Sequence, residues 1–181
     1  MLNILALSGS LRADSVNTKL LRAAGALAPE GVSLEVYDYS DVPLYNPEKG
    51  ESEAAERLKA AIRGADALLI ATPEYNYSIP GGLKNALDWA SRPAYGGPMA
   101  GVPTGVMSAA PGMLGGVRAQ QHLKLVLLGM AVPLFPYPEF VMSGAFQKFD
   151  EQGRLIDEAT VPFLERYMEA FTAWATSYPR S

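Results

Sequence analysis

Residues 2–17 read LNILALSGSLRADSVN, and this stretch decides the fold class. Its first seven residues, Leu2 to Ser8, form an apolar run that stops at Ser8-Gly9-Ser10, which is typical of a strand buried on both faces. A helix is expected next, because Ser15 or Asn17 can cap its start and apolar residues follow at helical spacing. A buried strand that leads into a helix indicates an α/β protein.

The rest of the chain continues this alternation of strands and helices. Further strands are predicted at residues 32–37, 67–71 and 102–108, and further helices at residues 51–63, 83–90, 117–128 and 161–175. Residues 131–141 contain Pro133, Pro136 and Pro138, so they predict a broken or edge strand at best. The pattern implies a parallel sheet with helices on both faces. Ligands bind such sheets beyond the carboxyl ends of the strands, so we expect the loops after the first, third and fourth strands to carry the chemistry.

The composition is that of an ordinary globular protein, and it narrows the classes of function. A chain of 181 residues, 49% of them hydrophobic, suits one domain, so residues 1–181 are expected to form a single domain. The net charge of −4 argues against nucleic acid as the main partner, because phosphate backbones require clustered Lys and Arg. The absence of cysteine excludes disulfides and thiolate metal sites. No apolar stretch is long enough to span a bilayer and the start is too short for a signal peptide, so the cytoplasm is the expected location.

The loop after the first strand offers donors for an anion. A helix N-terminus exposes unpaired N–H groups and carries partial positive charge. The polar side chains that can add to it are those of Ser10, Arg12, Ser15 and Asn17. One arginine suits one terminal phosphate monoester, whereas Asp14 is unfavourable there and is expected to point away. The alternative is a capped helix start with a solvent-facing arginine, and the spacing alone leaves both interpretations open.

The loop after the third strand is stiff and aromatic. It runs from Thr72 to Gly82, with prolines at both ends and glycines at its exit. Tyr75, Asn76 and Tyr77 give aromatic surface and amide groups, and exposed N–H groups of a rigid loop could hydrogen-bond the edge of a flat heteroaromatic ring. The alternative is a turn whose tyrosines pack on neighbouring helices.

Together these motifs resemble the NADPH-dependent FMN reductase family, which includes quinone, chromate and azo-dye reductases. The resemblance rests on Gly9-Ser10-Leu11-Arg12 with Ser15 and Asn17, on Pro73-Glu74-Tyr75-Asn76 with Pro80-Gly81, on Leu83-Lys84-Asn85-Ala86 with Asp88-Trp89, and on Ser108, Pro111-Gly112, Gly115-Gly116 and Arg118-Ala119-Gln120. The likeness covers nearly the whole chain in order. It implies a flavodoxin-like three-layer α/β/α sandwich with a five-stranded parallel sheet in the order 2-1-3-4-5.

The resemblance also implies roles for the candidate residues. Ser10, Arg12, Ser15 and Asn17 would hold the phosphate of FMN, Pro73 to Tyr77 would line the isoalloxazine ring, and Ser108 and Gly112 would close the other side of the flavin. It implies a homodimer or homotetramer in which Arg92 makes intersubunit contacts.

The implied activity is an oxidoreductase that uses NADPH or NADH to reduce quinones or similar small-molecule acceptors. A hydride would pass through bound FMN in a ping-pong cycle, so no catalytic His, Asp or Glu is expected. The rival interpretations are a flavodoxin-type electron carrier, against which Arg12 and the mild charge of −4 argue, and a flavin-binding regulatory protein.

Other groups of residues are expected to be structural. His122, the single histidine, is predicted to be an ordinary helix-surface residue. A solvated surface, rather than a metal site, is predicted for Asp38, Asp41, Glu48, Glu51 and Glu53. Core or interface positions are predicted for Phe163, Tyr167, Phe171 and Trp174. The aromatic residues of the proline-rich region, Tyr137, Phe140 and Phe146, could cover the active site of a partner subunit, and the sequence does not decide this.

Overall fold

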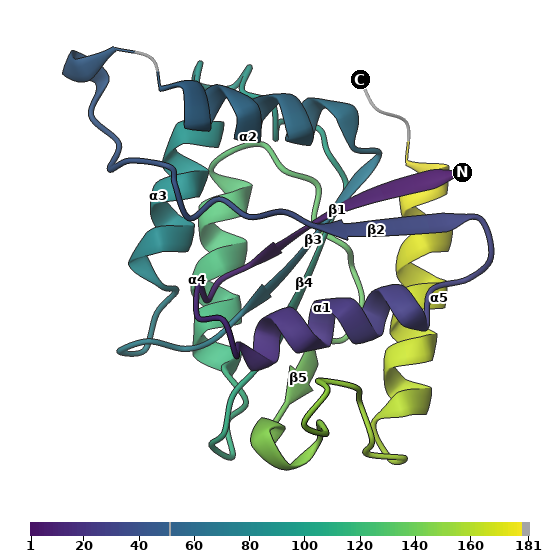
Figure 1. Cartoon of the computed structure of the whole chain (residues 1–181). Helices are drawn as coiled ribbons and strands as arrows, with labels where there is room; N and C mark the ends of the chain where they lie inside the picture. Colours follow the sequence, from purple (N-terminus) through teal and green to yellow (C-terminus); the bar gives the residue numbers. More distant parts are fainter. Residues whose placement is uncertain (51, 179–181) are drawn as a thin grey trace.

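The computed structural model describes residues 1–50 and 52–178, and the five strands found there form one parallel sheet (Figure 1). The strands are β1 (Leu2–Ser8), β2 (Val32–Val36), β3 (Ala67–Thr72), β4 (Thr104–Ala109) and β5 (Phe140–Met142). Their order is β2-β1-β3-β4-β5, with Leu5 of β1 opposite Glu35 of β2 and Leu68 of β3. The predicted order 2-1-3-4-5 is therefore confirmed.

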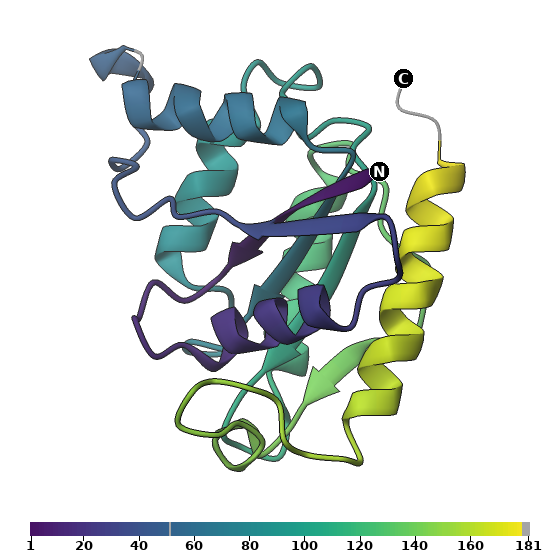
Figure 2. The ribbon, with the colours of Figure 1, turned by 45° about the vertical axis from the view of Figure 1, so that its right-hand side comes forward.

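Helices cover both faces of the sheet (Figures 1 and 2). They are α1 (Val16–Ala26), α2 (Glu53–Gly64), α3 (Gly81–Ala90), α4 (Val117–Leu128) and α5 (Val161–Ser177), and the two short 3-10 turns are η1 (Pro47–Lys49) and η2 (Ala145–Gln147). Side chains alternate along β1: Ile4 and Ala6 pack with α1 and α5, whereas Leu5 and Leu7 pack with α2, α3 and α4. This alternation confirms the three layers.

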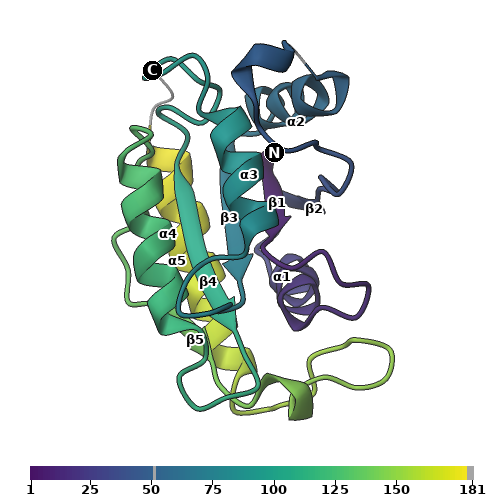
Figure 3. The same cartoon turned by 90° about the vertical axis from the view of Figure 1, so that its left-hand side faces the viewer.

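The central strand β3 is buried along its whole length, which explains its unbroken apolar sequence. Its carboxyl end lies beside those of β1 and β4. Figure 3 shows the loops that follow these three strands at the same end of the sheet, the lower end in that view. The three loops that we expect to carry the chemistry thus lie together at one end of the sheet, and their binding of a ligand stays a prediction.

Several predicted boundaries need correction. The fourth strand begins at Thr104 rather than at residue 102, because Pro103 lacks the N–H group that a strand residue donates. The third helix begins two residues earlier than predicted, at Gly81 directly after Pro80. The second helix begins at Glu53 with Ser52 as its N-cap, and predicted position 51 lies outside the described residues.

The proline-rich region is an edge, as predicted, but only its end is a strand. The strand pairing with β4 covers Phe140–Met142, whereas Leu134 makes one isolated bridge to Thr104. Pro133, Pro136 and Pro138 have no N–H group to donate to the sheet. Continuous pairing with β4 therefore begins only after the last of these prolines. Phe140 is buried in the core, while Tyr137 and Phe146 are exposed.

The residues predicted to be structural lie mostly where expected. Asp38, Asp41, Glu48 and Glu53 are exposed, and Glu51 falls outside the described part. In α5, Tyr167 and Phe171 are buried and Trp174 is half-buried, but Phe163 is exposed and so is not a core residue. Of the helices in residues 1–50 and 52–178, none is both long and apolar enough to cross a membrane. Within the same residues, no group of three or more His, Asp or Glu side chains could hold a metal ion.

Candidate functional site

Three loops meet beyond the carboxyl ends of β1, β3 and β4. They span residues 9–15, 73–80 and 110–116. The first two are in direct contact, since the hydroxyls of Ser10 and Tyr75 lie 3.4 Å apart, and the N–H of Gly9 also donates to Ala71 O, near the end of β3, at 2.7 Å. The candidate site is therefore one continuous surface built from segments far apart in the sequence.

Gly9 allows the first loop to press against β3. A Cβ atom at this position would lie 2.8 Å from Thr72 Oγ1 and 3.0 Å from Thr72 Cα. The second contact is with backbone, which cannot move aside without shifting the end of the strand. Glycine is thus required here by the close approach of two chains, whatever ligand the loop binds.

The first loop presents free donors at the start of α1. Ser15 is the N-cap, since its Oγ accepts from the N–H of Thr18 at 3.3 Å. The N–H groups of Val16 and Asn17 have no hydrogen-bond partner within the described part of the chain. Arg12 is exposed and makes no ion pair with any described residue. Unpaired amides, a helix N-terminus and a guanidinium are the groups that an anion site needs, and the binding of an anion here stays a prediction.

Asn17 is held differently from the other polar residues of the loop. Its side chain is 1% exposed and bonds twice to the end of β4: Nδ2 donates to Ala109 O at 2.9 Å, and Oδ1 accepts from Ala109 N at 3.0 Å. The side chain therefore joins the first turn of α1 to the carboxyl end of β4. Only the backbone N–H of Asn17 is left for a ligand in this geometry, and its role in binding stays a prediction.

Asp14 brings a negative charge into the same loop. Its exposed carboxylate pairs with the ammonium group of Lys19, five residues further along the chain. The hydrogen bond and charge of Lys19, with a smaller contribution from Arg12, lower the pKa of Asp14, so the group is ionised at neutral pH. The loop in which we predict an anion site thus contains a carboxylate whose charge is balanced by Lys19.

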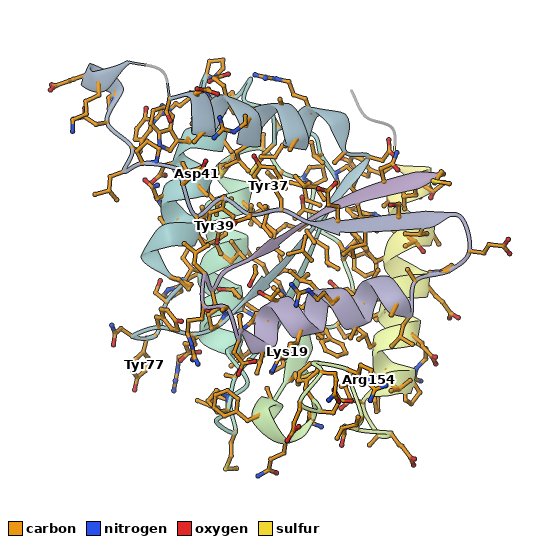
Figure 4. The ribbon with its side chains drawn as sticks, in the orientation of Figure 1. Lys19, Tyr37, Tyr39, Asp41, Tyr77 and Arg154 are labelled. Atoms are coloured by element: carbon orange, nitrogen blue, oxygen red, sulfur yellow. The ribbon has the colours of Figure 1, made fainter. Side chains whose placement is uncertain are left out.

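The second loop contains a tight turn with unusual backbone angles. Tyr75 and Ser78 exchange two hydrogen bonds of 2.9 and 3.0 Å, and the residues between them, Asn76 and Tyr77, have φ angles of 49° and 66°. Non-glycine residues seldom adopt these left-handed angles, and such strain is concentrated at ligand-binding sites. Both tyrosine rings remain accessible, Tyr75 at 45% and Tyr77 at 65%, and Figure 4 shows Tyr77 at the periphery of the molecule. The tyrosines are therefore not buried between helices.

Helix α4 clamps this turn from one side. Glu74 accepts hydrogen bonds from Arg118 N at 3.2 Å and from Arg118 Nη1 at 3.1 Å, and the Arg118 guanidinium lies 4.3 Å from the centre of the Tyr77 ring. One turn later, His122 Nδ1 lies 3.0 Å from Ser78 Oγ. His122 is an exposed residue on a helix surface, as predicted, but its contact with the turn was not. The i,i+4 spacing of Arg118 and His122 is the signal that could have indicated a shared face.

Ser108 and Gly112, the two residues expected to close the other side of the flavin, differ in their exposure. A Cβ atom on Gly112 would meet nothing within 4 Å, so this residue faces open space. Ser108, in contrast, is fully buried beneath Gly116 and accepts a hydrogen bond of 2.8 Å from Gln120 Nε2. Gln120 also donates to Phe140 O, while its own Oε1 is buried without a hydrogen-bond partner among the described residues. The structure thus adds Gln120 to the site as the residue that supports Ser108.

Each of the three loops also exposes large apolar side chains. These are Leu11 in the first loop, Tyr75 and Tyr77 in the second, and Met113 and Leu114 in the third. Exposed apolar groups that converge from separate loops mark a binding surface. Next to the amides and guanidinium of the first loop, they fit a ligand with a flat apolar ring and a phosphate tail, which is the chemistry of FMN.

Comparisons with known proteins agree with this chemistry. The sequence model of the NADPH-dependent FMN reductase family matches residues 2–147. An NAD(P)H-dependent FMN reductase from Pseudomonas aeruginosa is 44% identical over 176 residues, which cover 96% of this chain and 95% of that protein. A quinone reductase from Pseudomonas putida is 40% identical over 169 residues, covering 92% and 90%. The solved structure of FerB, a flavoenzyme NAD(P)H:(acceptor) oxidoreductase from Paracoccus denitrificans, matches with a TM-score of 0.90 and 34% identity over 98% of this chain and 99% of that chain.

Proposed function

Because this chain belongs to the NADPH-dependent FMN reductase family, we propose that it binds FMN beyond the carboxyl ends of β1, β3 and β4 and uses NAD(P)H to reduce quinones or similar acceptors. The observation that carries the proposal is the pairing of two features in one surface. The start of α1 offers free amides beside Arg12, and the neighbouring loops expose apolar side chains. FMN, when bound, supplies the redox chemistry by taking a hydride from the nicotinamide and delivering electrons to the acceptor.

The residues divide into a phosphate end and a ring end. At the phosphate end, Ser10, Arg12, Ser15 and the backbone of Asn17 would supply donors. At the ring end, Pro73, Glu74, Tyr75, Asn76 and Tyr77 would lie along the ring, with Ser108 and Gly112 closing the other side. The clamp of Arg118 on Glu74 supports this division, because it holds the strained turn in one conformation before the ring arrives. A site held in place beforehand loses less entropy when the ligand binds.

The proposed chemistry requires no side chain to act as an acid or a base. The protein must hold the ring, leave one face open to reactants and offer hydrogen bonds where negative charge develops, and backbone N–H groups can perform the last task. Tyr75, Tyr77 and Met113 are exposed on the same surface, where we propose that a second flat molecule binds.

The first expected result concerns reduction by a nicotinamide nucleotide. Protein purified with FMN should be yellow, and anaerobic addition of NADPH should bleach its flavin absorbance within the time of a stopped-flow experiment. Addition of a quinone should restore the colour. Parallel runs with NADH give the preference between the two reductants. If neither NADPH nor NADH bleaches the yellow colour, the protein is a flavin-binding regulatory protein and not a reductase.

The second expected result concerns the order of the reaction. The sequence contains no second nucleotide-binding fingerprint, so reductant and acceptor would use the same open surface in turn. Initial rates measured against acceptor concentration at several fixed NADPH concentrations should then give parallel double-reciprocal lines. Lines that clearly intersect would mean that both substrates bind together, and the ping-pong cycle would be abandoned.

Assembly and location complete the proposal. We propose that residues 1–181 act as one FMN-binding domain and assemble into a homodimer or homotetramer. Exposed Leu44 and Tyr95, at 84% each, support a subunit interface near Arg92, whose guanidinium lies 5.5 Å from the Tyr45 ring of the same chain. The cytoplasm is the proposed location, because the reduced nicotinamide nucleotides that this enzyme would consume are kept there.

A further inference from the structure

The proposed phosphate-binding loop carries a negative charge that should oppose its ligand. Asp14 lies two residues after Arg12 and directly before the N-cap Ser15, and its side chain is 74% exposed. A phosphate monoester carries between one and two negative charges at neutral pH, so a bare carboxylate in this loop would repel it. Some feature of the protein must offset the charge of Asp14.

Lys19 offsets the negative charge of Asp14. Its Nζ is paired with the Asp14 carboxylate, and its side chain is only 19% exposed although it belongs to a surface helix. The burial comes from a segment more than 130 residues away. A Cβ atom on Gly153 would lie 3.4 to 3.6 Å from three carbon atoms of the Lys19 stem, so the backbone at Gly153 covers that stem. Figure 4 shows Lys19 on α1 and Arg154 in the segment after β5 that lies below this helix.

The covering segment is a hairpin of residues 148–156. Ile156 N donates to Lys148 O at 2.9 Å, and Asp150 N donates to Arg154 O at 3.0 Å. Across its turn, Arg154 donates to both carboxylate oxygens of Asp150, at 2.8 and 2.7 Å. Asp150 and Arg154 therefore pair with each other within the hairpin. Lys19 pairs with Asp14 in the first loop. The hairpin restricts the lysine stem and so keeps the ammonium group at Asp14.

We propose that Lys19 is a positioning residue for the phosphate of the flavin: by pairing with Asp14 it lets the loop accept a dianion and prefer FMN to riboflavin. The inference rests on the proposed FMN site. The inference can be tested by following the summed charge of three residues of the loop and the helix after it. Arg12, Asp14 and Lys19 together carry +1 in the native chain, 0 after Lys19→Gln, and +1 again when Lys19→Gln is combined with Asp14→Asn.

The experiment measures the dissociation constants of FMN and riboflavin for four variants by flavin fluorescence. We expect Lys19→Gln to weaken FMN binding about three- to tenfold and to change riboflavin binding less than about twofold. The double variant Lys19→Gln/Asp14→Asn should regain native FMN affinity to within about twofold, and Asp14→Asn alone should bind FMN at least as tightly as the native protein. Arg166→Gln, which removes the same charge from an exposed residue of α5 outside the hairpin, is the control and should leave both constants unchanged.

The outcomes separate this inference from the proposed function. Equal losses of FMN and riboflavin affinity in Lys19→Gln, or failure of Asp14→Asn to restore FMN binding, would mean that Lys19 only supports the fold, and the inference would be overturned while the FMN site stands. A native protein that takes up neither flavin would overturn both. Thermal unfolding of each variant shows whether a change in affinity comes from loss of folded protein.

Discussion

Arg12→Ala should weaken FMN binding roughly ten- to a hundredfold and leave riboflavin binding almost unchanged. The guanidinium is exposed and without an ion pair among the described residues, so its removal costs the folded protein no internal contact of that kind. A hydrogen bond to a charged group contributes about 1.5 to 3 kcal/mol, which corresponds to that loss of affinity. Titration of the apoprotein with each flavin, followed by fluorescence, measures the effect.

The control for this experiment is Arg166→Ala, because Arg166 is an exposed arginine on α5 that donates to Pro162 O and lies over the Phe163 ring, both within the same helix. It lowers the net charge by the same amount without touching the three loops. If Arg12→Ala binds FMN as tightly as this control does, Arg12 is a solvent-facing residue beside a capped helix, the alternative that the sequence left open.

Asn17→Ala is expected to destabilise the whole protein by about 2 to 4 kcal/mol of unfolding free energy. Both hydrogen bonds of the side chain go to the backbone of Ala109, and the substitution leaves the N–H and the C=O of that residue buried without these partners. An unsatisfied buried polar group costs about 1 to 3 kcal/mol. Urea denaturation of the apoprotein should therefore show a clearly lower midpoint with an unchanged slope.

Asn3→Ala is the matched control, because Asn3 is an exposed asparagine on β1 whose side chain makes no hydrogen bond within the described residues. Its effect should stay within about 0.5 kcal/mol. Should Asn17→Ala keep native stability and lose FMN instead, the side-chain amide would be a ligand of the flavin, and its bonds to Ala109 would not describe the liganded protein.

Much of the fold could be predicted because its signals are local. The apolar run of β3 and the alternating contacts of β1 follow from which residues must leave water, and Ser15 is a good cap wherever a helix starts with it. The errors lie at boundaries decided by neighbours. Phe140–Met142 becomes a strand because β4 lies beside it, and Gly81 becomes helical because Pro80 positions the first turn.

The candidate site could be located from the sequence but not assembled from it. The rule that ligands bind at the carboxyl ends of parallel strands selects the three loops. It says nothing about Arg118, 44 residues from the Glu74 that it holds, or about Gln120, whose contact with Ser108 depends on how α4 packs on the sheet. The partners of polar side chains are chosen by packing, and packing joins segments that have no fixed spacing in the chain.

The sequence by itself determined the strands, their order by resemblance, and the residue types that meet at the end of the sheet, because periodicity and helix caps act over a few residues. Only the tertiary structure decided which of those residues are free to bind. Arg12 has no ion-pair partner among the described residues, Asn17 is bound to Ala109, and Asp14 is paired with a lysine that Gly153 covers. The reason is physical: a polar group is available to a ligand only when no other group of the folded chain has already satisfied it, and that depends on contacts between distant segments.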